Sequence, residues 1–277
     1  MSDASNEAPP PVGGDGHEFV TYQNYLMIPE LLSLQRPLSE PEEHDELLFI
    51  VIHQVYELWF RVVLHELDHA SESLSEGEAP VARGSLKRVL TILKVLVAQL
   101  DILETMTPWE FLSFRDRLES ASGFQSAQFR ALEFALGHKR PGVLTPLPEG
   151  SDERKALEAR LTQPTLWDAF LRFLESRGYP VPAEVLGRDV SRPVEASPAV
   201  QQILVDAYRK DPEVSELCER LVDLDEGLQE WRYRHVKMVE RTIGRKKGTG
   251  GSAGVDYLRN TLGRPVFPDL WEIRSVL

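Results

Sequence analysis

The chain has 277 residues, of which 42% are hydrophobic and 27% are charged, and it carries a net charge of −13 at pH 7. This composition is that of an ordinary soluble globular protein, long enough for one large domain or two small ones. The acidic surplus excludes a nucleic-acid partner, because phosphate binding requires clustered positive charge. The single cysteine, Cys218, excludes an internal disulfide and a cysteine-based zinc cluster, as is typical of the cytoplasm.

The first 18 residues are polar, acidic and rich in Pro and Gly, and they lack the basic start and apolar core of a signal peptide. We therefore predict a disordered N-terminal tail over residues 1–18. No unbroken apolar run reaches the roughly 18 residues that a membrane-spanning helix needs. These features predict a cytoplasmic protein without a membrane partner.

The first long helix is predicted to open at the capping-box pattern Ser39-Glu40-Pro41-Glu42 and to end near Ser75. A second is predicted over about 82–106, where apolar residues recur at helical spacing on one face. This face consists of Leu86, Val89, Leu90, Leu93, Leu96, Val97 and Leu100. A second capping box, Thr107-Pro108-Trp109-Glu110, has Pro at the first helical position and predicts a short helix through Arg117.

Strand signals are almost absent from the sequence, since there is no Asn-Gly or Asp-Gly hairpin and no sustained period-2 alternation. Pro and Gly mark loops over 138–150 and 178–197. Further helices are predicted over about 124–137, 151–161, 165–177, 198–210 and 211–244. We therefore predict an all-α fold with long core helices, which forms a single domain over residues 19–277.

The sequence HELDH (65–69) in the first long helix matches the zinc-binding pattern H-E-x-x-H. A catalytic zinc needs a third protein ligand, and Glu72 stands where the extended pattern requires Gly. His and Glu are mostly solvent-facing residue types, so the pattern also arises by chance on helices. We interpret HELDH as a solvated helix face, and a zinc hydrolase is the rival interpretation.

His53 lies in the most apolar sector of the same predicted helix. At about 100° per residue, Phe49, Phe60, Leu64 and Leu67 fall on the same side as this imidazole. A histidine in such surroundings is either a core residue that one hydrogen bond satisfies or a group that contacts a ligand.

His235 interrupts an apolar seam of the longest predicted helix, whose members recur at alternating steps of four and three. The seam consists of Leu217, Leu221, Leu224, Leu228, Trp231, His235, Met238 and Thr242. Its neighbours include the cations Arg232, Arg234, Lys237 and Arg241. This combination fits a large planar anion such as haem, with an axial His on the iron and cations near the propionates. A buried structural His whose flanking cations pair with local Glu is the alternative.

The stretch GTGGSAG (248–254) matches a dinucleotide-binding pattern in form, but a helix precedes it where that motif needs a strand. Its free N–H groups and the hydroxyl of Thr249 suit a small carboxylate or ammonium group, in a loop that closes over a substrate. A plain flexible connector is the alternative.

Several stretches of the chain, taken in order, resemble the tryptophan 2,3-dioxygenase family. They are TYQNYL (21–26), LSEPEEHDELLFIVIHQVYELWF (38–60), FRDRLESASGFQS (114–126), QEWRYRH (229–235), IGRKKGTGGSAGVDYL (243–258) and FPDLWEIR (267–274). The resemblance spans about residue 19 to the C-terminus. Indoleamine 2,3-dioxygenase shares the chemistry and a similar glycine loop, but the sequence of its N-terminal half differs from that of this chain.

The resemblance implies an all-helical homotetramer that binds haem b and uses O2 as co-substrate. It implies that His235 is the axial ligand of the haem iron, that Ser122 lies near the haem, and that His53 contacts the indole N–H on the distal side. Arg115 is expected to bind the substrate carboxylate, and Thr249 the amino-acid end. The implied indole-pocket residues are Phe49, Ile50, Val51 and Ile52, and Phe111 is implied to bind the substrate near its carboxylate. Tyr22 and Tyr25 are implied to enter the pocket of a neighbouring subunit. Some bacterial relatives have Tyr where Phe111 stands.

The activity that the resemblance implies is insertion of O2 across the indole C2–C3 bond of L-tryptophan, giving N-formylkynurenine. This is the first step of kynurenine-type tryptophan degradation. A related dioxygenase of other indole substrates and a non-catalytic haem or O2-binding protein are the alternatives. The latter would retain His235 but has no use for a substrate clamp at Arg115 and Thr249.

Overall fold

The computed structural model describes residues 19–244, 246 and 254–277. The predicted tail over 1–18 and the glycine-rich stretch up to residue 253, with Thr249, lie outside the described residues. The chain divides into two compact units, Met1–Pro37 and Leu38–Leu277. The first unit contains two short helices, α1 (Tyr22–Tyr25) and α2 (Ile28–Leu32), and neither has a buried side chain. The single domain over residues 19–277 stays a prediction.

The second unit, Leu38–Leu277, is built from α-helices joined by loops and short 3-10 turns. Its α-helices are α3 (His44–Ser75), α4 (Ala79–Leu103), α5 (Pro108–Arg115), α6 (Ala127–Ala135), α7 (Asp152–Leu161), α8 (Leu166–Ser176), α9 (Ala183–Leu186), α10 (Pro198–Lys210), α11 (Pro212–Ile243), α12 (Val255–Arg259) and α13 (Pro268–Glu272). The 3-10 turns are Asp116–Leu118, Gly123–Gln125, Pro141–Leu144 and Ile273–Ser275. The described part of the chain contains no β-strand, which confirms the predicted all-α fold.

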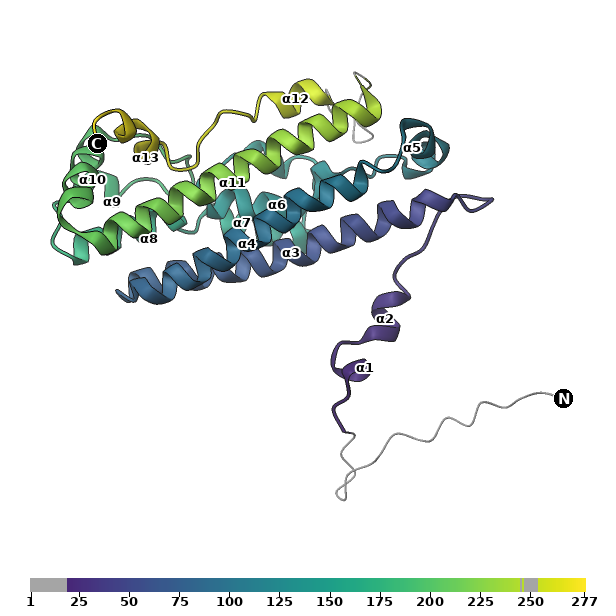
Figure 1. The fold of residues 1–277 in the computed structure, drawn as a ribbon, viewed down its shortest axis with the longest axis horizontal. Helices are drawn as coiled ribbons and strands as arrows, with labels where there is room; N and C mark the ends of the chain where they lie inside the picture. The colour runs from purple at the N-terminus through teal and green to yellow at the C-terminus, as the bar shows by residue number, and fades with distance from the viewer. Residues whose placement is uncertain (1–18, 245, 247–253) are drawn as a thin grey trace. The chain divides into compact units, whose positions relative to one another are not determined.

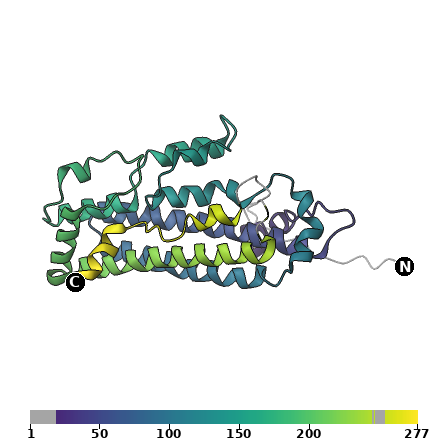
Figure 2. The same ribbon diagram turned by 90° about the horizontal axis from the view of Figure 1, so that it is seen from above.

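Three long helices, α3, α4 and α11, form the centre of this unit (Figure 1). α4 packs against both of the others, and the views of Figures 1 and 2 show all three lying side by side. α3 runs antiparallel to α4 and α11, so that its N-terminal end lies beside their C-terminal ends. This end of the unit is where His53 on α3 and His235 on α11 come together.

The apolar face predicted for the second long helix packs into the core. Five of its members are buried on α4, namely Leu86, Val89, Leu93, Leu96 and Leu100, while Leu90 and Val97 are half-buried. Full burial of a leucine or valine side chain contributes about 1.5–3 kcal/mol. The helical spacing of these residues therefore explains why α4 occupies the middle of the unit.

The two predicted capping boxes have different outcomes. Thr107 caps α5 as predicted, because its hydroxyl accepts from the backbone N–H of Glu110 and the Glu110 carboxylate accepts from the N–H of Thr107. The prediction at Ser39 is wrong, because α3 begins at His44 and its N-cap residue makes no side-chain capping bond. The Ser39 hydroxyl and the backbone N–H groups of Leu38 and Ser39 instead bond to the buried carboxylate of Glu46.

Hydrogen bonds to one buried carboxylate hold the C-terminal segment against α11. Asp225 is fully buried and accepts hydrogen bonds from the backbone N–H groups of Val266 and Phe267, at 2.9 and 3.1 Å. The indole N–H of Trp271 donates to the same oxygen at 2.9 Å. The segment after α12 therefore lies along α11 (Figure 1).

Among the described helices, α3 is long and apolar enough to cross a membrane by length and composition alone. Glu57 and Arg61 interrupt the apolar sequence of α3, so it contains no unbroken apolar run of the length that was considered above. A core helix of a soluble protein passes the same test, so one such helix is weak evidence. Here α3 packs against α4, α6 and α8.

Candidate functional site

A cavity of about 270 Å³ opens between α3 and α11, and its lining is mainly apolar. Six of the predicted site residues line it, namely Phe49, His53, Phe111, Arg115, Ser122 and His235. They come from α3, α5, α11 and the loop before α6. Three others predicted for the same pocket, Ile50, Val51 and Ile52, do not line it: Ile52 is buried in the core and Val51 is exposed.

His53 is held in one tautomer by its own helix. Its Nδ1 lies 2.6 Å from the carbonyl oxygen of Phe49, and because a carbonyl can only accept, Nδ1 carries the proton. Burial lowers the pKa of His53 below 6.5, and the bond to Phe49 and the charge of Glu57 offset only part of that effect. The ring is therefore neutral at pH 7, and its Nε2 has a free lone pair.

His235 is also neutral at pH 7. Burial, together with the charges of His53 and Arg130, lowers the pKa of His235 to about 4. Its ring stacks on Trp231 at a centroid distance of 5.2 Å and an interplanar angle of 11°. A neutral imidazole fixed by stacking is the form that binds a metal ion.

The two halves of the α11 seam have different surroundings, and this explains why a histidine interrupts it. Its first four members, Leu217, Leu221, Leu224 and Leu228, are fully buried in the core. The last four, Trp231, His235, Met238 and Thr242, line the cavity. The seam therefore faces packed side chains along one half of the helix and a ligand cavity along the other.

Three of the four cations predicted to neutralise haem propionates form ion pairs with acidic side chains. Arg234 pairs with Asp101 on α4 and with Glu104 just after its end, and Arg241 also pairs with Glu104. Lys237 pairs with Glu240 on its own helix. Pairing with a local Glu, as in the alternative interpretation, is therefore found for Lys237, whereas Arg234 and Arg241 pair with acids far away in the sequence. Arg232 alone of the four lines the cavity.

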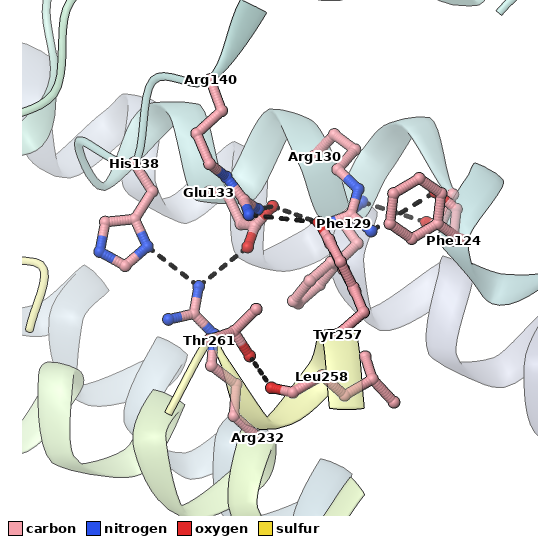
Figure 3. A network of polar contacts seen from close by, with 11 residues as sticks. Phe124, Phe129, Arg130, Glu133, His138, Arg140, Arg232, Tyr257, Leu258 and Thr261 are labelled. Atoms are coloured by element: carbon pink, nitrogen blue, oxygen red, sulfur yellow. Dashed lines mark hydrogen bonds and ion pairs between the residues drawn. The ribbon is translucent and has the colours of Figure 1, made fainter. Parts of the chain in front are cut away.

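Sequence reasoning missed the charged residues that α6 contributes to the cavity wall, Arg130 and Glu133. Both are buried, and Glu133 accepts hydrogen bonds from Arg130, Arg140 and Arg232 (Figure 3). No spacing signal in the sequence could have found them, because α11 and α6 are about 100 residues apart. The available signal was the presence of two opposite charges on an otherwise apolar helix face.

The aromatic residues around His53 form one wall of the cavity. The Phe49 ring lies 4.1 Å from that of His53, centroid to centroid, and 5.7 and 5.5 Å from those of Phe111 and Phe114. Ser122 lines the cavity, but its hydroxyl accepts from the backbone N–H of Phe124 and so also caps a 3-10 turn.

Three predicted residues are not placed in the cavity. Tyr22 and Tyr25 lie on α1 of the first unit, with both side chains exposed, and Thr249 is outside the described residues. Their contributions to a substrate site stay predictions.

The HELDH stretch is only partly the solvated face that was expected. His65 and His69 are exposed, but Glu66 is buried and accepts a hydrogen bond of 2.6 Å from Arg88. Glu66 therefore links α3 to α4. Within residues 19–244, 246 and 254–277, no group of three His, Cys, Asp or Glu side chains is arranged to hold a metal ion.

The residues around the cavity fit a haem group. A neutral, stacked imidazole at His235 suits an axial ligand, the apolar lining suits a porphyrin, and the buried guanidinium groups of Arg130 and Arg232 suit its carboxylates. His53 on the facing helix leaves an acceptor nitrogen for a second ligand.

The chain is similar to known proteins over nearly its whole length. The profile of the tryptophan 2,3-dioxygenase family matches residues 13–144 and 203–277. Tryptophan 2,3-dioxygenase of Herpetosiphon aurantiacus is 60% identical over 261 residues, which cover 93% of this chain and 98% of the relative. The enzyme of Anaeromyxobacter sp. strain K is 57% identical, over 93% of this chain and 96% of the relative. That of Bacillus anthracis is 42% identical, over 95% of each chain. Similarity of this extent means that the chain belongs to the tryptophan 2,3-dioxygenase family.

Proposed function

We propose that the protein inserts both atoms of O2 across the indole C2–C3 bond of L-tryptophan and releases N-formylkynurenine. The observation that carries this proposal is the shared cavity of His53 and His235, two neutral imidazoles supplied by different helices. His235 has a lone pair for a metal ion, and Nε2 of His53 has a lone pair that can accept from an N–H donor. A pocket of this kind suits a haem-bound reaction on an indole.

His235 is proposed to hold the iron of haem b. When bound, this haem supplies the iron centre at which O2 is bound and activated. Stacking on Trp231 fixes the orientation of the His235 ring, and the lowered pKa keeps it unprotonated down to about pH 4. The apolar lining of the cavity keeps bulk water away from the reacting groups.

His53 is proposed to orient the substrate. Because Nδ1–H donates to the Phe49 carbonyl, Nε2 can only accept, and an indole N–H is a suitable donor. The indole ring is then placed against Phe49 and Phe111. An indole N–H is a very weak acid, so His53 holds this proton without removing it.

The amino-acid end of tryptophan requires polar partners. Arg115 lines the cavity, and a guanidinium can bind both oxygens of a carboxylate. Thr249 is proposed to contact the same end of the substrate. Phe111 contributes no hydroxyl here, so the carboxylate has one hydrogen bond fewer than with Tyr.

The active form is proposed to be a homotetramer in the cytoplasm. Tyr22 and Tyr25 are exposed aromatic side chains on a short helix, and we propose that they enter the pocket of a neighbouring subunit. The oligomer would then be part of the active site.

Two absorbance measurements test the proposed function. The purified protein should show the Soret band of haem at about 400 nm. Adding L-tryptophan and O2 to the reduced protein should then produce N-formylkynurenine. A Soret band without product would indicate a haem or O2-binding protein, and neither signal, with zinc bound, would indicate a hydrolase.

A further inference from the structure

An ionic cluster adjoins the cavity wall, and we define it as Arg130, Glu133, Arg140 and Arg232, of which Arg140 is half-buried and the other three are buried. Glu133 on α6 is its only acid. Arg130 and Arg140 donate to one carboxylate oxygen, at 2.7 and 2.5 Å, and Arg232 on α11 donates to the other at 2.9 Å (Figure 3). The cluster thereby ties α6 to α11 one turn before His235.

The cluster has more positive charge than negative. One carboxylate faces three guanidinium groups, so its four side chains carry a net charge of +2. His138 adds no charge, because burial and the nearby Arg232 lower its pKa below 6.5. Its Nδ1 accepts from Arg232 at 3.1 Å, and its Nε2 then donates to the carbonyl of Pro265.

Two nearby acids lie outside the cluster. Asp225 acts on Arg232 through space, and its carboxylate accepts hydrogen bonds from the C-terminal segment and from Gln229. Glu57 lines the cavity, and its carboxylate accepts from Gln128. These two carboxylates offset the positive charge only from a distance, because in the described part of the chain all three arginines of the cluster share Glu133 as their ion-pair partner. A buried guanidinium group is stabilised when an anion binds directly to it.

Both Arg130 and Arg232 line the cavity, as does Glu133, whose two carboxylate oxygens accept from the arginines. Arg130 is 7% exposed and Arg232 is 4% exposed, and both line the same space as His235. The Nε–H group of each is buried without a hydrogen-bond partner in the described structure. Arg140, by contrast, does not line the cavity, although it makes the same kind of contact with Glu133.

We propose that Arg130 and Arg232 form a carboxylate subsite of the cavity, which receives the carboxylate side chains of the cofactor. This inference rests on the proposed function, because it takes haem to be the cofactor. Of the four cations that the sequence suggested for this role, the proposal retains Arg232 and excludes Arg234, Lys237 and Arg241, which pair with other acids. Arg115 remains for the carboxylate of the substrate.

The test compares haem with its dimethyl ester, which has the same ring but no carboxylate charge. The full chain is loaded with either pigment, and its release to excess apomyoglobin is followed by the Soret absorbance. We define the carboxylate ratio as the release rate of the ester divided by that of haem. For the unmodified protein, we expect a ratio of about 10 or more, since 1.4 kcal/mol corresponds to one decade.

Arg130→Gln and Arg232→Gln retain a donor for Glu133 but remove the charge. Each should lower the carboxylate ratio at least threefold. Arg140→Gln, which loses a Glu133 contact outside the cavity, and Arg234→Gln, which removes a cation from the same helix, should leave the ratio unchanged. If either arginine variant fails to fold, the other carries the test alone.

An unchanged ratio in the Arg130 and Arg232 variants would overturn the subsite, and so would a fall in Arg140→Gln or Arg234→Gln as large as theirs. If Arg115→Gln alone lowers the ratio, the cofactor carboxylates lie at the substrate end and the proposal is wrong. These outcomes leave the proposed function intact, whereas a chain that binds no haem refutes both.

Discussion

Replacement of His53 by alanine separates an orienting role from a catalytic base. His53→Ala removes the Nε2 acceptor and leaves Phe49, whose ring lies 4.1 Å from the imidazole, without its neighbour. A hydrogen bond between neutral groups contributes about 0.5–1.5 kcal/mol, which corresponds to a rate factor of about 2 to 13. A general base contributes about 100- to 10,000-fold. The two roles therefore predict different losses.

We expect kcat/KM for L-tryptophan to fall by about 2- to 13-fold in His53→Ala. The assay is N-formylkynurenine formation, with the Soret absorbance used to normalise each sample to its haem content. A tryptophan analogue with sulfur in place of the N–H provides the control. Its binding constant should be the same for the variant and the unmodified protein, because it has no proton to donate to Nε2.

A loss of 100-fold or more in kcat, with normal haem content and substrate binding, would refute this reasoning. His53 would then be an essential base. Equal weakening of tryptophan and its sulfur analogue would also contradict the orienting role, because the damage would then come from lost packing against Phe49.

Four other perturbations test the remaining geometry. Acid should reduce kcat/KM with an apparent pKa below 6.5, because Nε2 of His53 loses its lone pair when it is protonated, and this limb should be absent in His53→Ala. Asp225→Ala should lower the free energy of unfolding in urea by about 2 kcal/mol or more, since it leaves two buried backbone N–H donors and the part-buried indole N–H of Trp271 without a partner, whereas Asp223→Ala at the surface should change it by about 0.5 kcal/mol or less. Glu66→Gln should retain turnover, and a 100-fold loss would instead support the zinc interpretation of HELDH. Phe111→Tyr should lower KM for tryptophan about 2-fold or more by restoring a hydroxyl near Arg115, and an unchanged KM would contradict this placement.

Local signals in the sequence predicted local structure well. The capping box at Thr107, the end of α3 at Ser75 and the apolar face of α4 all follow from residues close together in the chain. The box at Ser39 failed because a stronger acceptor, Glu46, lies seven residues away, beyond the span that the pattern considers. The short helix α9 was missed because Pro and Gly dominate the stretch around it.

Long-range pairing limited the prediction of the site. The sequence placed four cations near His235 but could not show that packing of α4 on α11 brings Asp101 and Glu104 to two of them. The same limit hid Arg130 and Glu133. Phe111, Arg115 and Ser122 entered through family resemblance, since no spacing pattern singles them out. The helical faces of His53 and His235, by contrast, were predicted from periodicity alone.

The change of surroundings along the seam of α11 gives the two halves of this helix a different dependence on the proposed cofactor. The leucines from 217 to 228 are buried in the protein core, so their packing is complete in the chain alone. The turns that carry His235 and Met238 border the cavity, and a ligand that fills it would add packing partners there. We therefore expect loss of the cofactor to speed backbone hydrogen exchange in the second half of α11 and to leave the first half protected.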